Sequence, residues 1–204
     1  MSAEAAESGR DEASKWKRTA LLVIDMQNDF ILPGSLMHVK GGAAIVPAVQ
    51  RAVSFAREKG ALIVWVIREH HISGRDVERF RRHHYATSKV GPTVKGTKGA
   101  ALVDGLRIEP EDQVVVKYRF SAFFGTNLHS VLHNAGIETI VVTGVQTPNC
   151  IRQTVFDAVA HDYPSVILLS DATGAASPEI HEANLSDMRN VSVSTPTLAE
   201  WMGF

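Results

Sequence analysis

The stretch TIVVTGVQTPNCIRQTVFDA (139–158) decides the predicted fold. Its first residues, Thr139–Thr143, form an apolar run, which suits a strand buried on both faces of a parallel sheet. Thr147 and Pro148 then predict a helix start, because threonine caps a helix N-terminus and proline fits its first turn. The stretch therefore indicates a strand, a turn and a helix, which is the repeating unit of parallel α/β folds.

The same alternation extends over residues 18–204. Ala44–Lys59 and Thr126–Asn134 carry apolar residues at helical spacing and end near glycines, and Ser177-Pro178 and Thr195-Pro196 predict two further helix starts. Five apolar runs predict buried strands, and a sixth alternates, as an edge strand does. We therefore expect a three-layer α/β/α sandwich around a Rossmann-like, six-stranded, mostly parallel sheet. The six runs are Thr19–Asp25, Ala61–Ile67, Gln113–Lys117, Thr139–Thr143, Ser165–Ser170 and Asn190–Ser194.

Composition narrows the class of protein. The 204 residues are 45% hydrophobic and 21% charged, with a net charge of −1, which excludes a disordered chain and argues against nucleic-acid binding through bulk charge. No apolar window is long enough to span a membrane, and no apolar core of a signal peptide follows Met1. We expect a cytoplasmic protein with a flexible tail over residues 1–17, for which a weakly amphipathic helix is the alternative, and one domain over residues 18–204.

The segment Arg68–Arg107 fits the alternation poorly. It contains five glycines or prolines, from Gly74 to Gly99. It also carries nine Lys or Arg and four Asp or Glu, whereas residues 108–204 carry four Lys or Arg and eleven Asp or Glu. A long irregular insertion in a compact domain usually serves function or an interface, and a solvated basic loop is the alternative. We expect a homo-oligomer, a dimer or tetramer, whose subunit contact uses this segment; a basic lid over an anionic substrate is the rival interpretation.

Three reactive side chains are predicted at one edge of the sheet. Asp25 ends the first strand, Lys117 ends the third, and Cys150 follows the fourth in the first turn of a helix. Ligands bind at the carboxyl ends of strands in open α/β sheets, so these residues form a candidate nucleophile, base and cation. The helix N-terminus and a nearby lysine predict a lowered pKa for the Cys150 thiol. Taken singly, each residue is as well explained by packing, capping or solvation.

The motifs LLVIDMQNDF (21–30), KYRFSAFFGTNL (117–128) and TGVQTPNCIRQTVFDA (143–158) resemble the isochorismatase-like cysteine hydrolases, over about residues 18–201. The resemblance implies an Asp25-Lys117-Cys150 catalytic triad and no organic cofactor. It also implies a cis peptide bond between Val145 and Gln146. The backbone N–H groups of Gln146 and Cys150 would then form an oxyanion hole. Within Asp25–Asp29, Gln27 and Asp29 are expected to orient the loop rather than react.

Two departures from the family pattern refine this expectation. Isochorismatases that cleave a vinyl ether typically lack the cysteine, so Cys150 favours acyl transfer. Nicotinamidases hold a metal through an Asp-x-His pair and a further histidine, whereas this chain offers Glu69 and His71, with His83 or His84 as a third ligand. The pair is degenerate and the third ligand is not placed by the sequence. We therefore predict no metal.

The predicted function is cysteine-dependent hydrolysis of a C–N amide or ureido bond in a small molecule, through a thioester. Vinyl ether hydrolysis with Asp25 as general acid, or a catalytically silent binding or assembly module, are the alternatives. Aromatic and cationic side chains near the same edge are expected to contact the substrate, with core packing and structural pairing as their alternatives. The predicted substrate contacts are Phe30, Arg68, Arg119, Phe123 and Gln146.

Overall fold

The computed structural model describes residues 12–86 and 90–204. A five-stranded parallel sheet forms its centre, in the order β3-β2-β1-β4-β5. Within the described ranges, no helix is both long and apolar enough to cross a membrane. The strands are β1 (Thr19–Ile24), β2 (Leu62–Arg68), β3 (Gln113–Lys117), β4 (Thr139–Val145) and β5 (Ser165–Gly174).

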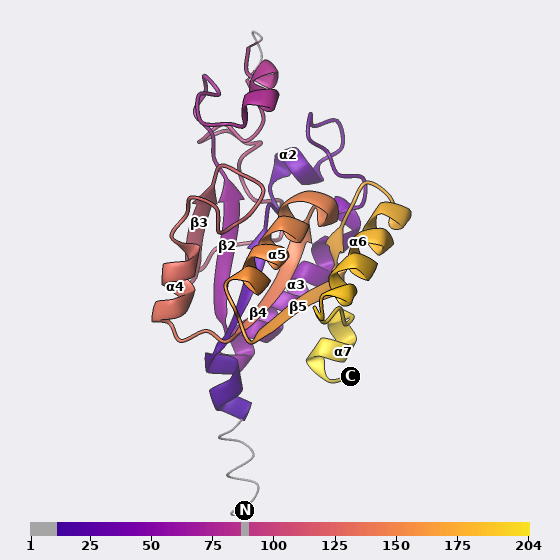
Figure 1. Ribbon diagram of the computed structural model, residues 1–204. Helices are drawn as coiled ribbons and strands as arrows, with labels where there is room; N and C mark the ends of the chain where they lie inside the picture. Colours follow the sequence, from indigo (N-terminus) through magenta and orange to yellow (C-terminus); the bar gives the residue numbers. More distant parts are fainter. Residues whose placement is uncertain (1–11, 87–89) are drawn as a thin grey trace, which may run out of the picture.

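Helices cover both faces of the sheet (Figure 1). On one face lie α3 (Gly42–Lys59) and α7 (Leu198–Met202). On the other lie α4 (Leu128–Asn134), α5 (Arg152–Ala160) and α6 (Pro178–Asn190). The predicted three-layer α/β/α architecture is therefore confirmed, with parallel strands joined by helical crossovers.

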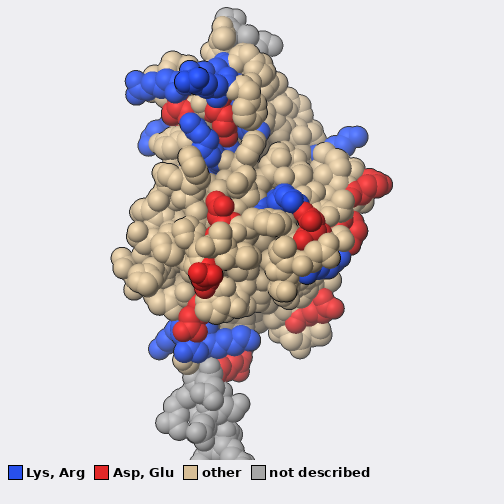
Figure 2. All heavy atoms as spheres, in the orientation of Figure 1, with Lys and Arg blue, Asp and Glu red and all other residues tan. Residues whose placement is uncertain are grey.

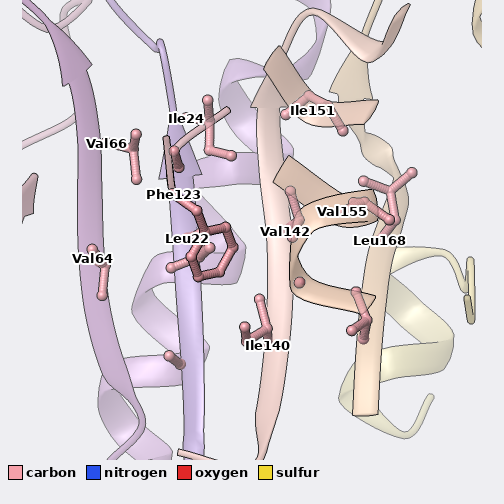
Figure 3. Close-up of a cluster of buried hydrophobic side chains, with 14 of the residues drawn as sticks. Leu22, Ile24, Val64, Val66, Phe123, Ile140, Val142, Ile151, Val155 and Leu168 are labelled. Carbon is pink, nitrogen blue, oxygen red and sulfur yellow. The ribbon is translucent and has the colours of Figure 1, made fainter. Parts of the chain in front are cut away.

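The side chains of β1 alternate between two apolar cores. Leu22 and Ile24 point into the cluster beneath α4, α5 and α6, part of which Figure 3 shows. Leu21 and Val23 point into the cluster beneath α3 and α7. Both faces of the central strands are thus fully buried, which explains why their sequences are continuously apolar rather than alternating.

The sixth predicted strand does not form. Asn190 ends α6, and of the stretch Asn190–Ser194 only Ser194 pairs with β5, through an isolated parallel bridge to Ile167. The helix cap predicted at Thr195 is also wrong, since α7 begins after Thr197. The Thr197 hydroxyl accepts a hydrogen bond from the Glu200 N–H while the Glu200 carboxylate accepts one from the Thr197 N–H. Ser177 caps α6 as predicted, by accepting from the Ile180 N–H.

Part of the predicted tail is ordered. Residues 12–17 are helical, and the Trp16 side chain is buried against the edges of the Phe55 and Trp201 rings, with ring centroids 5.3 and 5.5 Å away. The prediction of a flexible tail is wrong for these residues, because a buried tryptophan anchors them to α3 and α7. Residues 1–11 of the predicted tail lie outside the described residues.

Candidate active site

The three reactive side chains converge where the strand order reverses. From β1 the chain continues to β2 and β3 on one side, and β4 and β5 lie on the other. Asp25 directly follows β1, Lys117 ends β3, and Cys150 follows β4. Reversal of strand order leaves a crevice at the carboxyl ends of an open α/β sheet, where such folds bind ligands.

Asp25 and Lys117 form a fully buried ion pair. The Lys117 Nζ donates a 2.8 Å hydrogen bond to the Asp25 Oδ2, and a second, of 3.2 Å, to the Arg119 carbonyl. Asp25 is 1% exposed and Lys117 is 0% exposed. Since β2 lies between their strands, the long lysine side chain crosses one strand to reach the carboxylate. The Asp25 Oδ1 has no hydrogen-bond partner among the described residues, which leaves one carboxylate oxygen for a proton.

Cys150 lies in a single turn of π-helix between β4 and α5. The turn spans Thr147–Ile151 and is preceded by Gln146, which takes the capping position that the sequence assigned to Thr147. The Thr147 hydroxyl instead hydrogen-bonds the His181 ring at 2.8 Å. The peptide bond between Val145 and Gln146 is cis.

A second hydrogen-bonded link holds this turn against the chain after β3. The Thr154 hydroxyl donates to the Cys150 carbonyl at 2.6 Å and accepts from the Ala122 N–H at 2.9 Å. Thr154 is completely buried, so water does not compete for these bonds. The cysteine backbone is therefore held rigidly in place relative to the segment that follows Lys117.

The pKa of the Cys150 thiol is raised, contrary to the prediction from its place at a helix start. Burial is the largest cause, and the negative charge of nearby Asp25 adds to it. The positive charges of Lys117 and Arg68 lower the pKa by less. The resting site therefore holds a neutral thiol beside a carboxylate, which is a nucleophile paired with a base.

This arrangement predicts how Cys150 reacts with iodoacetamide as pH rises. The alkylation rate should show its inflection above about 8.5, the ordinary value for a thiol, because the thiolate forms late. Asp25→Asn should move the inflection downward, since it removes the negative charge that opposes ionisation. Asp104→Asn, at an exposed site, should leave it unchanged. An inflection below that of glutathione in the native protein would contradict the assigned direction.

Arg68 is a third charged residue at the site, beside Asp25 and Lys117. Its guanidinium is 1% exposed, and its Nη2 lies 3.1 Å from a Glu78 carboxylate oxygen while its Nε lies 4.0 Å from Asp25. Burial alone would lower the pKa of Arg68, but the negative charges of Asp25, Glu78 and the Cys150 thiolate, which exists only at the high pH where an arginine titrates, outweigh it and raise the pKa. Arg68 is therefore permanently charged and already paired.

The other predicted substrate contacts differ in their surroundings. Phe30 is buried and borders a small enclosed space beside Arg68. Arg119 donates from Nη1 to the Asp76 and Tyr118 carbonyls, at 2.8 Å each, and lines an open cleft. Phe123 belongs to the apolar core beside α4 and α5 (Figure 3), so core packing explains it. Gln146 immediately precedes the Cys150 turn.

The candidate metal ligands do not converge. Glu69 forms an ion pair with Lys95 at 3.2 Å, and the His71 Nδ1 lies 2.8 Å from the Ser73 hydroxyl. The ring between them in sequence, His70, is buried, and burial lowers its pKa to about 4. Over residues 12–86 and 90–204 no three His, Cys, Asp or Glu side chains are arranged to hold a metal ion. The described residues therefore do not fit the metal centre of nicotinamidases.

Over its described residues, 69–86 and 90–107, the segment after β2 is irregular, as predicted, apart from one 3₁₀ helix over Arg79–His84. Figure 2 shows Lys and Arg side chains gathered at the upper end of the molecule, where Figure 1 draws this segment. Side chains that follow β1 hold it in place. Gln27 donates to the Arg68 and Ala100 carbonyls, at 2.7 Å each, and Asp29 accepts from the Thr93 N–H at 2.6 Å. Both residues thus orient the loop, as the sequence indicated.

An open cleft of about 290 Å³ lies next to the reactive residues. Phe120 and Ser121, which follow Lys117, and Gln153, one turn after Cys150, form part of its wall. The carboxylate of Glu78 borders both this cleft and the small enclosed space that contains Arg68. Chain segments that follow Lys117 and Cys150 thus form part of the wall of this cleft, which approaches the size of typical small-molecule pockets.

Two residues that the sequence did not assign to the site stand out here. Glu78 is buried against Arg68, and Arg81 lies over the Phe120 ring, with 4.9 Å between its guanidinium carbon and the ring centroid. Both come from the irregular segment, where no periodicity predicts which side chains turn inward. In the sequence, the two residues stand out only as charged residues of a segment with a net positive charge.

Comparisons with known proteins agree with this geometry. A family model described as "Isochorismatase domain" matches residues 19–200. The chain is 63% identical over 190 residues to an Arabidopsis thaliana protein named "Probable inactive nicotinamidase", covering 93% of this chain and 97% of that protein. It is 32% identical over 191 residues to the ureidoacrylate amidohydrolase RutB of Methylobacterium radiotolerans, covering 83% of this chain and 72% of the relative.

A solved structure shows the same fold. The crystal structure of an isochorismatase family protein from Desulfovibrio vulgaris superposes with a TM-score of 0.88 at 40% identity, covering 90% of this chain and 96% of that one. The family resemblance of the three sequence motifs is thereby confirmed. The chain belongs to the isochorismatase family of hydrolases.

Proposed function

We propose that the protein is a cysteine-dependent hydrolase that cleaves a C–N amide or ureido bond of a small molecule. The observation that supports this most strongly is the buried thiol of Cys150 beside the carboxylate of Asp25, which Lys117 holds at 2.8 Å. A nucleophile, a proton acceptor and a cation that fixes the acceptor are what acyl transfer requires.

The first half of the reaction forms a thioester. Asp25 takes the thiol proton, and the Cys150 sulfur bonds to the substrate carbonyl carbon, whose oxygen becomes negatively charged. The N–H groups of Gln146 and Cys150 stabilise this oxyanion. When the oxygen restores its double bond, the C–N bond breaks, and the leaving nitrogen takes the proton from Asp25.

The second half releases the product. Asp25 removes a proton from a water molecule, whose oxygen attacks the thioester carbon. The C–S bond then breaks, and the sulfur recovers its proton from Asp25. Lys117 keeps its proton throughout, and its charge holds the Asp25 carboxylate in one orientation between the two half-reactions.

The RutB relative is named an amidohydrolase of ureidoacrylate, and the Arabidopsis relative is named a probable inactive nicotinamidase. Neither name excludes hydrolysis of an amide other than nicotinamide. All three residues of the proposed triad are present here and lie together, which favours an active site over a silent module. Vinyl ether cleavage needs no thiol, and the paired Cys150 and Asp25 favour acyl transfer over it.

A substrate screen tests the proposal. Purified protein is incubated with nicotinamide, ureidoacrylate, biuret, carbamoyl amino acids and isochorismate, and ammonia and pyruvate are measured. We expect ammonia from at least one amide or ureido compound and no pyruvate from isochorismate. Pyruvate release without ammonia would instead establish vinyl ether hydrolysis. The predicted homo-oligomeric state and cytoplasmic location stay predictions.

A further inference from the structure

Arg81 is a cation without a carboxylate partner. Its guanidinium carbon lies 4.9 Å from the Phe120 ring centroid and 5.8 Å from that of Phe80, and both rings line the open cleft. Among residues 12–86 and 90–204, no carboxylate oxygen lies within 4.0 Å of it. A half-buried guanidinium stacked on aromatic rings keeps its hydrogen-bond donors for a further partner.

The charges around the triad leave this cation unbalanced. Asp25 and Glu78 supply two negative charges, and Lys117, Arg68 and Arg81 supply three positive charges. The Cys150 thiol is neutral in the resting site, so it does not restore the balance. An uncompensated charge is costly away from water, and an anion bound beside Arg81 would compensate it.

The other two arginines near the cleft are engaged elsewhere. Both terminal nitrogens of Arg68 face the Glu78 carboxylate, at 3.1 and 3.5 Å, which leaves it little capacity for a substrate. Arg119, which lines the cleft, gives two hydrogen bonds to backbone carbonyls, both from Nη1, so its guanidinium is tied to the backbone at one end. Arg81, for which the described residues provide no such partner, is therefore the least engaged of the three arginines.

We propose that Arg81 is the residue that selects an anionic substrate, by binding a carboxylate at the wall between the enclosed space that it lines with Arg68 and Glu78 and the open cleft lined by Phe80 and Phe120. This inference rests on the proposed function, and it narrows the substrate class to small amides or ureido compounds that carry a carboxylate beside the scissile group. Glu78 keeps Arg68 neutralised, so the incoming carboxylate meets one free guanidinium rather than two. Neutral amides of the same size lack the group that Arg81 binds.

Two alkylating reagents of nearly equal size test the site without a known substrate. Iodoacetate carries a carboxylate, iodoacetamide carries a neutral amide, and Cys150 is the only cysteine in the chain, so mass spectrometry reports its alkylation directly. We expect the ratio of the iodoacetate rate to the iodoacetamide rate to exceed that of glutathione. Arg81→Gln should lower this ratio about tenfold, the effect of losing a charge-assisted contact of about 1.4 kcal/mol.

Arg79→Gln is the matched control. It removes the same charge from the same short helix, but Arg79 is exposed, and the ratio should stay as in the native protein. An equal ratio in the native protein and Arg81→Gln would overturn the proposal, as would failure of both reagents to reach Cys150. Alkylation needs no turnover, so this test is independent of the substrate screen. If the protein were inactive on every substrate but still preferred iodoacetate through Arg81, the proposed hydrolysis would be wrong and the anion site would stand.

Discussion

Replacing Cys150 by alanine is expected to lower kcat at least about a thousandfold on whichever amide or ureido substrate the screen identifies. The variant lacks the sulfur that forms the thioester, while Asp25 and Lys117 stay paired. Water would have to attack the carbonyl directly, without a covalent intermediate. Ammonia release at saturating substrate measures the effect, and unchanged circular dichroism shows that the fold is intact.

Cys150→Ser serves as a companion variant, because it keeps a hydroxyl beside Asp25 in place of the thiol. A serine hydroxyl ionises far less readily than a thiol, and this variant should also lose most of its activity. Full turnover by Cys150→Ala would refute the thioester mechanism. If that turnover released pyruvate from isochorismate, the chemistry would be general acid catalysis by Asp25.

The sheet was predictable because its strands are buried on both faces. A continuous apolar run such as Ala61–Ile67 has few alternatives in a chain of this size. The C-terminal region was harder to predict. Val191 and Val193 alternate with polar residues, yet α6 extends to Asn190 and the chain reaches β5 only at Ser194. Trp16 was missed because its anchoring partners, Phe55 and Trp201, are distant in sequence.

The reactive residues of the site were predictable, whereas their electrostatics were not. Strand ends locate Asp25 and Lys117, but the raised pKa of Cys150 depends on how deeply the turn is buried, and sequence does not encode burial of a single side chain. The ion pair of Arg68 with Glu78 could not be predicted for a similar reason. Each partner was visible as a charge, but only the path of an irregular loop brings the two together.

Gly144→Ala is expected to destabilise the protein by more than about 4 kcal/mol, beyond the usual range of single substitutions. Gly144 lies in β4 with φ of +110° and pairs with Ile24 of β1. An added Cβ would lie 2.0 Å from the Ile24 carbonyl oxygen, which is backbone and is fixed in the sheet. The clash would push β1 and β4 apart beside Asp25, so activity should fall together with stability.

Gly136→Ala separates the clash from the backbone conformation. Gly136 also has a positive φ, of +66°, but no atom lies within 4 Å of its added Cβ. This control should cost only the strain of a left-handed alanine, about 1–2 kcal/mol. Urea unfolding of the two variants measures both free energies. Equal losses of unfolding free energy in the two variants would show that β1 and β4 separate at this point with little cost in free energy. The close approach of Gly144 to Ile24 would then not be what fixes Asp25 in the site.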